Sequence, residues 1–162
     1  TGSACLAILC AHYFPNAHID ALDISTVALN VAQKNVSYYN LANQINLFAS
    51  DLFNAIGHKQ YHVIISNPPY VDDLDLDAMP TEYHYEPRVG LAGGGGDGLD
   101  IVRRILYQAK QYLVAGGILI VETGNSAQAL AIIYPQLPFI WLELEHGGEG
   151  VFLLHKEDLP GD

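Results

Sequence analysis

Cysteines, basic residues and long apolar runs are scarce in this sequence of 162 residues. Its two cysteines, Cys5 and Cys10, are too few for a disulfide scaffold and are not spaced as a zinc-binding pair. We expect them to be buried thiols on a helix in a protein of the reducing cytoplasm. No run of about 18 apolar residues and no charged segment followed by an apolar one is present, so the sequence predicts neither a membrane span nor a secretory signal.

The shortage of basic residues also limits the partners. Seven Lys and Arg stand against eighteen Asp and Glu, which gives a formal net charge of −11. This charge repels a phosphate backbone, so we expect no direct nucleic-acid binding by this segment, whereas a basic protein partner is compatible with it. Solubility alone also explains an acidic surface. The seven histidines lack the spacing of metal ligands, and we expect no bound metal.

Hydrophobic residues make up half of the chain and charged residues 15%, which supplies a core and excludes intrinsic disorder. Helical and strand patterns alternate along the sequence. Helices are predicted over Ala4–Phe14, Ser25–Tyr39, Leu99–Leu113 and Ser126–Ile133, and strands over His18–Ile24, Ile45–Ala49, Tyr61–Ser66, Ile118–Glu122, Phe139–Glu145 and Val151–His155. The alternation predicts an α/β, Rossmann-like fold with a doubly wound, mostly parallel sheet and a C-terminal antiparallel hairpin. The strand Tyr61–Ser66 is apolar enough to be buried on both faces.

The long segment from Asn67 to Gly96 lacks a regular period, and loops of that length are mostly functional or disordered. Its acidic side chains favour either a solvated loop or a rim that receives a basic protein. These side chains are Asp72, Asp73, Asp75 and Asp77. The run Gly93–Gly96 is not a phosphate loop, because no strand precedes it and no Lys-Ser or Lys-Thr follows. We expect a flexible hinge there.

Three features follow predicted strand ends or precede a helix, where ligands of such folds bind. The turn Thr1-Gly2-Ser3-Ala4 before the first helix either presents amides to a ligand or is a plain tight turn. Asp23 ends the next strand at a spacing that suits a carboxylate on a ribose, and a helix-capping acid is the alternative. Asp51 follows the strand Ile45–Ala49 as an N-cap or as a contact of a bound adenine.

A fourth feature, Asn67-Pro68-Pro69-Tyr70, directly follows the strand Tyr61–Ser66 and is far more specific. The two prolines have fixed φ and donate no backbone hydrogen bond, so the chain leaves the sheet in one stiff direction. The carbonyl of Pro68 and the amide oxygen of Asn67 then provide two neighbouring acceptors. Such a pair can hold a planar NH2 group by both hydrogens.

Asn-Pro-Pro-Tyr after the fourth strand resembles the signature of S-adenosylmethionine-dependent methyltransferases that act on amide or exocyclic amino nitrogens. Further motifs resemble the glutamine-N5 methyltransferases, and those near the C-terminus look most like the branch that methylates a large-subunit ribosomal protein. The release-factor branch shares Asn-Pro-Pro-Tyr but usually differs around the closing hairpin. These motifs are Glu82–Pro87, Gly90–Ala92, Asp97–Leu99, Arg103–Leu106, Glu122–Ser126, Tyr134-Pro135, Pro138-Phe139 and Gly147–Phe152.

The resemblance implies a class I methyltransferase fold, S-adenosyl-L-methionine as the cofactor and a basic ribosomal protein as the partner. The implied cofactor-binding residues are Thr1, Gly2, Ser3, Ala4 and Cys5 at the methionine end, Asp23 at the ribose, Asp51 and Leu52 at the adenine, and Asn67. The implied substrate-binding residues are Asn67, Pro68, Pro69 and Tyr70, of which Asn67, Pro68 and Tyr70 are expected to be catalytic. The family usually has glycine where this chain has Ala4, whose methyl group we expect to narrow the approach to the cofactor.

Two other functions are compatible with part of these observations. A nucleic-acid amino-group methyltransferase uses a similar Asn-Pro-Pro-aromatic clamp on a flipped base, and the acidic charge counts against it. The second alternative is a non-catalytic module that binds the cofactor or serves in assembly. The complete Asn67–Tyr70 motif counts against this alternative. The sequence does not fix the oligomeric state, and a monomer is expected.

The first motif of the fold is incomplete, because the chain begins at Thr1 inside the glycine turn. In the family the strand before this turn lies at the middle of the sheet, between the strands that end at Asp23 and Ser66. We therefore expect residues 1–162 to be most of a catalytic domain, with its first strand and a helical substrate-recognition domain upstream.

Overall fold

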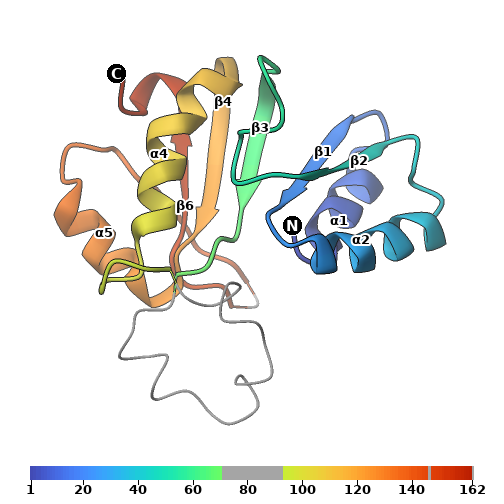
Figure 1. Cartoon of the computed structure of the whole chain (residues 1–162). Helices are drawn as coiled ribbons and strands as arrows, with labels where there is room; N and C mark the ends of the chain where they lie inside the picture. The colour runs from blue at the N-terminus through green and yellow to red at the C-terminus, as the bar shows by residue number, and fades with distance from the viewer. Residues whose placement is uncertain (71–92, 146, 162) are drawn as a thin grey trace, which may run out of the picture. The chain divides into compact units, whose positions relative to one another are not determined.

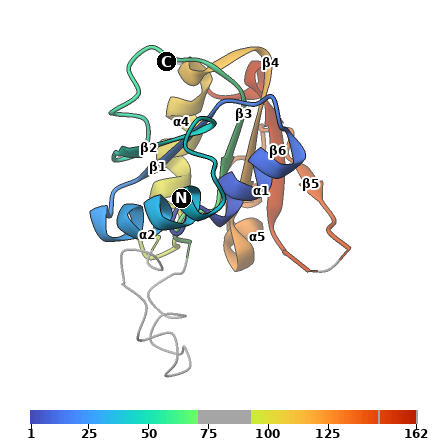
Figure 2. The same ribbon diagram turned by 90° about the vertical axis from the view of Figure 1, so that its right-hand side faces the viewer.

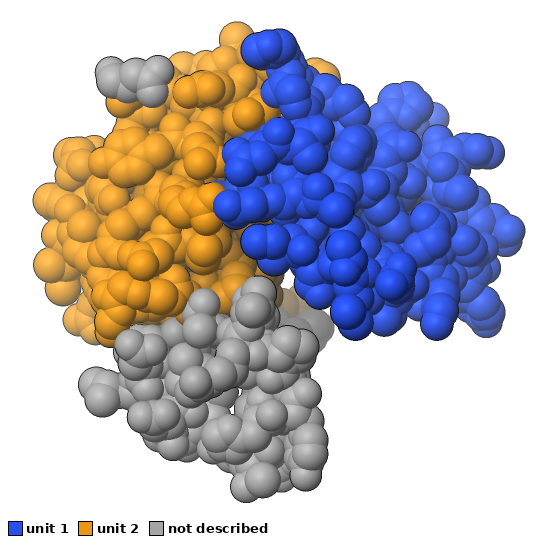
Figure 3. Space-filling model, viewed as in Figure 1, with its two compact units in different colours: residues 1–59 blue, residues 60–162 orange. Residues whose placement is uncertain are grey.

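The computed structural model describes residues 1–70, 93–145 and 147–161. The chain divides into two compact units, Thr1–Lys59 and Gln60–Asp162, which Figure 3 shows in blue and orange. Within residues 1–70, 93–145 and 147–161, no helix has the length and apolar character needed to cross a membrane. The acidic side chains Asp72 to Asp77 and the motifs Glu82–Pro87 and Gly90–Ala92 lie outside the described residues.

The first unit alternates helices and strands in the predicted order. It consists of α1 (Cys5–Tyr13), β1 (Ile19–Asp23), α2 (Thr26–Tyr38) and β2 (Ile45–Ala49). The two strands are parallel and in register from Ile19 with Ile45 to Asp23 with Ala49. Ser25 caps α2, because its hydroxyl accepts a hydrogen bond from the Ala28 amide at 3.2 Å. The first residue of the helix predicted over Ser25–Tyr39 is therefore its N-cap.

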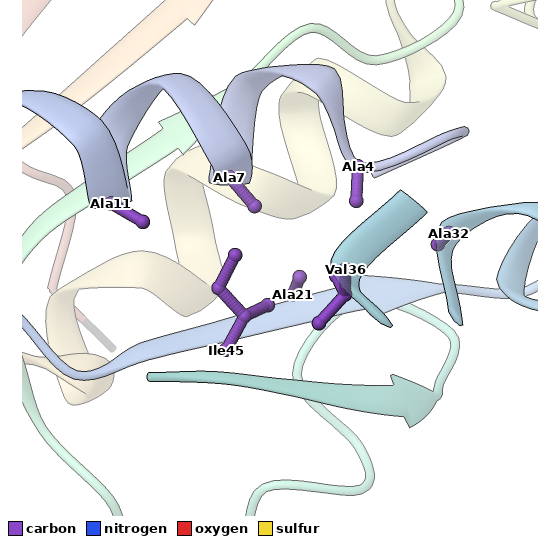
Figure 4. Packing of buried hydrophobic residues seen from close by; sticks show 7 residues of the cluster. All are labelled: Ala4, Ala7, Ala11, Ala21, Ala32, Val36 and Ile45. Carbon is purple, nitrogen blue, oxygen red and sulfur yellow. The ribbon is translucent and has the colours of Figure 1, made fainter. Parts of the chain in front are cut away.

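Small side chains build the core of this unit (Figure 4). Each of its helices and strands contributes, and the members are Ala4, Ala7, Ala11, Ala21, Ala32, Val36 and Ile45, all at most 6% exposed. Alanine methyl groups let the helix backbones approach the strands closely, since little side-chain volume separates them. The turn before α1 belongs to this core through Ala4, so packing fixes where the helix begins.

The second unit holds a four-stranded mixed sheet (Figures 1 and 2). The strand order is β3-β4-β6-β5, with β3 parallel to β4 and the other two pairs antiparallel. The elements are β3 (Tyr61–Ser66), α4 (Asp100–Tyr112), β4 (Leu113–Glu122), the 3-10 turn η3 (Gly124–Ser126), α5 (Ala127–Ile133), β5 (Ile140–Leu142), β6 (Val151–His155) and the 3-10 turn η4 (Lys156–Asp158). The predicted closing hairpin is confirmed by the pairing of β5 with β6.

The amphipathic helix α4 packs on this sheet through one apolar stripe. Val102, Ile105, Leu106 and Ala109 recur every three or four residues and are at most 1% exposed. They contact the β4 side of the sheet (Figure 1), where Leu119 and Val121 are fully buried. Burial of this stripe holds β4 in place, and with it the segment that follows the strand.

Three local predictions are wrong. Strand β4 begins at Leu113 rather than Ile118 and continues through Gly116-Gly117, because Leu113 pairs with Tyr61 of β3. Strand β3 is not buried on both faces: Val63 and Ile65 are 45% and 40% exposed, and β4 is its only partner among the described strands. Cys5 is an exposed thiol, whereas Cys10 on the same helix is half-buried.

Candidate functional site

Asp23 organises the turn at the carboxyl end of β1. Its Oδ2 accepts hydrogen bonds from the Gly2 amide at 2.7 Å and from the Thr1 amino group at 3.0 Å, while its Oδ1 accepts one from the Ser25 amide at 2.8 Å. Burial raises the pKa of this carboxyl, but the hydrogen bonds from the Ser25 and Gly2 amides, together with the hydrogen bond and charge of the Thr1 amino group, outweigh burial and lower the pKa. Asp23 therefore anchors the entry to the helix α2, which is one of its two predicted roles. For the other role, contact with a ribose, its Oδ1 has acceptor capacity left for a hydroxyl group.

The turn Thr1–Ala4 has two residues with left-handed backbone. Gly2 has φ 56° and Ala4 has φ 67°, and the Gly2 amide is held by Asp23. The methyl group of Ala4 is fully buried and points into the core of the first unit (Figure 4). The methyl group thus packs against the protein's own core, and its effect on the approach of the cofactor stays a prediction.

Replacing Ala4 by glycine is expected to change cofactor affinity by less than about twofold. Glycine relieves the strain of the left-handed backbone but loses a buried methyl group and backbone rigidity. The gain and the loss in the free energy of folding are each about 1 kcal/mol, so they nearly cancel. Calorimetric titration of the full-length protein with S-adenosylmethionine tests the affinity. A tenfold gain in affinity would show that the methyl does obstruct the ligand.

The turn after β2 is held by a residue that the sequence did not single out. The Ser50 hydroxyl donates to the Leu52 carbonyl at 2.7 Å and accepts from the Ala55 amide at 3.0 Å. Leu52 has φ 49°, a left-handed conformation that this pair of contacts stabilises. Asp51 and Leu52, predicted to flank an adenine, thus lie in a turn that the Ser50 side chain holds.

Asn67 lies beside Glu122 at the carboxyl edge of the sheet in the second unit. Its Nδ2 donates a hydrogen bond to Oε2 of Glu122 at 3.1 Å. The sheet register explains the contact: Ser66 is paired with Val121, so Asn67, just past the end of β3, lies beside Glu122, the last residue of β4. Pro68 is buried and Pro69 is half-buried behind Asn67.

Tyr70 turns back to the same carboxylate. Its hydroxyl donates to Oε1 of Glu122 at 3.4 Å, so one carboxylate accepts from both polar side chains of the motif. Burial, and next the neighbouring charge of Glu122, raises the pKa of the Tyr70 phenol. The phenol therefore stays protonated and remains a donor at neutral pH. Asn67, Tyr70 and Glu122 form one hydrogen-bonded cluster, which we call the carboxylate cluster.

Ser126 ties the motif to the segment that precedes α4. Its hydroxyl lies 3.1 Å from the Tyr70 carbonyl and 3.3 Å from the Asp97 carbonyl, and its single hydrogen is shared between these two acceptors. The Asp97 carboxylate binds the guanidinium of Arg103, whose hydrogen bond is the main cause that lowers the pKa of Asp97. Both ends of the long segment from Asn67 to Gly96 are thus anchored to the second unit. The glycines of that segment include Gly94, Gly95 and Gly96 with φ of 76°, 72° and 68°.

Gly124 leaves room for the Tyr70 ring. A Cβ atom at Gly124 would lie 2.8 Å from Cζ of Tyr70, and its φ is 49°. We expect Gly124→Ala to displace the ring and to lower the methyl transfer that the sequence motifs predict by about 10–100-fold, since catalysis depends on placement to within about 1 Å. Steady-state assays of the full-length protein measure this loss.

Gly57→Ala is the matched control for that variant. Gly57 also has a left-handed φ, of 61°, but no atom lies within 4 Å of the position of its Cβ. Both variants therefore carry the same backbone strain of about 1–2 kcal/mol. Equal losses of activity in the two variants would rule out a specific role of Gly124 beneath the Tyr70 ring.

The structure brings the predicted residues together in two groups, one in each unit. Thr1, Gly2 and Asp23 meet in the first unit, and Asn67 and Tyr70 meet at Glu122 in the second. The site roles of Glu122, Ser126 and Gly124 were missed, although the sequence contains a usable signal: Glu122 ends a strand just as Asn67 follows one.

The donors and acceptors of the two groups suit the hydroxyl groups of one ligand and the side-chain amide of another. In residues 1–70, 93–145 and 147–161, no group of three His, Cys, Asp or Glu side chains is arranged to hold a metal ion. In the first unit, the Asp23 carboxylate retains an acceptor position beside a glycine turn. These features are compatible with the ribose of S-adenosylmethionine.

Comparison with known proteins gives close relatives. The chain is 46% identical over 159 residues to a ribosomal protein uL3 glutamine methyltransferase of Francisella tularensis, covering 98% of this chain and 50% of the relative. It is 48% identical over 162 residues to the protein of the same name from Neisseria gonorrhoeae, covering 100% of this chain and 54% of the relative. The chain thus spans about half the length of these curated relatives. Their names confirm the resemblance to glutamine methyltransferases that the motifs indicated.

The fold and the family are shown by two further comparisons. A crystal structure of a methyltransferase from Pyrococcus furiosus superimposes with a TM-score of 0.68 at 18% identity, covering 96% of this chain and 71% of that one. At this identity the likeness shows the fold alone, and it confirms the predicted Rossmann-like, class I methyltransferase architecture. The sequence profile of the methyltransferase small domain matches residues 1–82. The chain belongs to the methyltransferase small domain family.

Proposed function

We propose that the protein containing this chain transfers a methyl group from S-adenosyl-L-methionine to the side-chain amide nitrogen, N5, of a glutamine in a large-subunit ribosomal protein. Two relatives at 46% and 48% identity carry the name ribosomal protein uL3 glutamine methyltransferase. The observation that carries the proposal is the Asn67–Tyr70 motif, placed at a strand end with its Asn67 and Tyr70 side chains held on Glu122.

The protein's main task in this reaction is positioning. An amide nitrogen is a poor nucleophile, because its lone pair is delocalised into the carbonyl group. The bound cofactor supplies a methyl group on a sulfonium, which is a good leaving group. Asn67 and the Pro68 carbonyl would accept the two hydrogens of the glutamine NH2 and so fix the direction of its lone pair. They would also favour the positive charge that the nitrogen gains.

Proton removal does not demand a strong base in this scheme. The amide nitrogen would form its bond to the methyl carbon as the carbon–sulfur bond breaks and the neutral thioether leaves. The N-methylated amide would then be protonated and would lose its proton readily to water. Pro69 and Tyr70 would pack against the glutamine side chain and exclude competing water from it. The half-burial of both residues supports that role.

We further propose that the first unit supplies the cofactor contacts. Thr1–Cys5 would bind the methionine end, Asp23 the ribose, and Asp51 with Leu52 the adenine. The fixed turns at Gly2 and Leu52 and the spare acceptor position on Asp23 support these roles. A ribosomal protein is basic and folds in the cytoplasm, so we place the enzyme there, and the net charge of −11 suits such a partner.

The test is incubation of the full-length protein with methyl-labelled S-adenosylmethionine, separated ribosomal proteins and ribosomal RNA. The proposal predicts label in one large-subunit protein and none in RNA. Label confined to RNA would replace the proposal with a nucleic-acid amino-group methyltransferase. Absence of label together with calorimetric binding of the cofactor would indicate a non-catalytic binding module.

A further inference from the structure

Glu122 has no role in the chemistry described so far, yet it contacts both polar side chains of the motif. Resting on the proposed function, we propose that Glu122 is a positioning residue that sets which end of the Asn67 amide faces the substrate. Its carboxylate accepts from Asn67 Nδ2 at 3.1 Å and from the Tyr70 hydroxyl at 3.4 Å.

The argument begins with the ambiguity of an asparagine side chain. Its amide carries an acceptor oxygen and a donor NH2 group of nearly equal size, so a rotation of 180° exchanges them at little steric cost. Only the orientation with Oδ1 toward the substrate can accept a hydrogen from a glutamine NH2. In the other orientation two NH2 groups would face each other, and neither could accept.

A carboxylate resolves this ambiguity because it accepts hydrogen bonds and donates none. Next to Glu122, the NH2 end of Asn67 makes a charge-assisted hydrogen bond, whereas the oxygen end would meet a like partial charge. The NH2 end is therefore fixed on Glu122 and Oδ1 is left for another partner. The Tyr70 hydroxyl, also held as a donor, occupies the second carboxylate oxygen.

The position of Glu122 is itself rigid. Its backbone pairs with Val151 of β6, and the next residue, Thr123, is fully buried. Thr123 donates to the Gly150 carbonyl through both its amide and its hydroxyl, each at 2.9 Å. The pairing of β4 with β6 and the two hydrogen bonds of Thr123 thus hold Glu122 in place. A residue that orients another side chain needs such support.

The experiment uses the full-length protein and measures methyl transfer to the ribosomal protein. Glu122→Ala is expected to lower kcat about 10–100-fold, since the Asn67 amide then samples both orientations and loses its alignment. Glu122→Gln keeps the shape but stabilises either orientation, so a smaller loss, about 3–10-fold, is expected. Glu143→Gln, an exposed residue after β5, is the matched control and should retain wild-type activity.

An exchange of the two groups separates positioning from a merely structural role. Asn67→Asp alone faces two carboxylates toward each other and should be nearly inactive. When Asn67→Asp is combined with Glu122→Gln, the introduced glutamine amide donates to one oxygen of the introduced aspartate and leaves the other oxygen as the acceptor. This double variant should be at least about tenfold more active than Asn67→Asp alone, because it restores the charge-assisted hydrogen bond.

Two outcomes overturn the inference, and they differ from a failure of the proposed function. The first is a wild-type kcat in Glu122→Ala. The second is a double variant that has the thermal midpoint of the wild type but is no more active than Asn67→Asp alone. If the wild-type protein methylates no ribosomal protein, the proposed function fails and the role of Glu122 fails with it. Side-chain NH2 resonances of Asn67 that do not shift in Glu122→Ala would contradict the contact independently of activity.

Discussion

Asn67→Ala is expected to lower the rate of methyl transfer about 10³-fold. The side chain would supply one of the two acceptors that orient the glutamine NH2, and alanine supplies none. Cofactor affinity should fall but remain measurable, since the Asp23 turn and the turn after β2 are unaltered. Single-turnover assays and calorimetry of the full-length protein separate the two effects.

Asn30→Ala is the matched control for this variant. Asn30 is exposed on α2, so its removal changes neither the Asn67–Tyr70 motif nor the carboxylate cluster. Circular dichroism and the thermal midpoint should be the same in both variants. Full activity in Asn67→Ala would contradict the assignment of the motif as the substrate clamp.

Phe152→Ala is expected to lower the free energy of unfolding by about 3–5 kcal/mol, the cost of truncating a fully buried aromatic side chain. Phe152 is 0% exposed on β6, and its ring packs edge-on against Phe139 at 4.9 Å and Trp141 at 5.8 Å between centroids. Removing it opens a cavity under the hairpin that flanks β4. The strand that carries Glu122 loses support, so methyl transfer should fall as well.

Urea denaturation followed by tryptophan fluorescence measures the stability loss. Trp141 is the only tryptophan of the chain and contacts Phe152 directly, so its signal reports on the second unit. The control is Ile132→Ala on α5 of the same unit, which truncates a side chain that is 72% exposed and should cost less than about 0.5 kcal/mol. A loss below about 1 kcal/mol in Phe152→Ala would show that the hairpin does not pack as described.

The strands with strong local signals were predicted from sequence to the residue. Apolar runs and flanking turn residues gave Ile45–Ala49, Tyr61–Ser66 and Val151–His155, with the same bounds as β2, β3 and β6. The start of β4 was missed because Gly116-Gly117 is typical of a turn. Pairing of Leu113 with Tyr61, distant in sequence, decides that a strand forms there.

Local sequence also predicted one part of the candidate site, whereas the other part depends on contacts between distant residues. Asn67–Tyr70 was found from sequence because two prolines after an apolar strand are a local signal. The side-chain contact of Asn67 with Glu122 spans 55 residues and depends on the register of β3 and β4, which no local pattern contains. The direction of the Ala4 methyl was also beyond sequence reasoning, since it depends on a left-handed backbone conformation packed into the alanine core.

Fragmentation mass spectrometry of the product tests the central claim most directly. The full-length enzyme and its Asn67→Ala variant are each incubated with S-adenosylmethionine and the large-subunit ribosomal protein, and the modified peptide is sequenced. We predict one added methyl group on the side-chain amide of a glutamine with the wild-type enzyme, and about 10³-fold less of this product from the variant in the same time. A methyl group on any other side chain, or an equal yield from both enzymes, would contradict the proposed reaction.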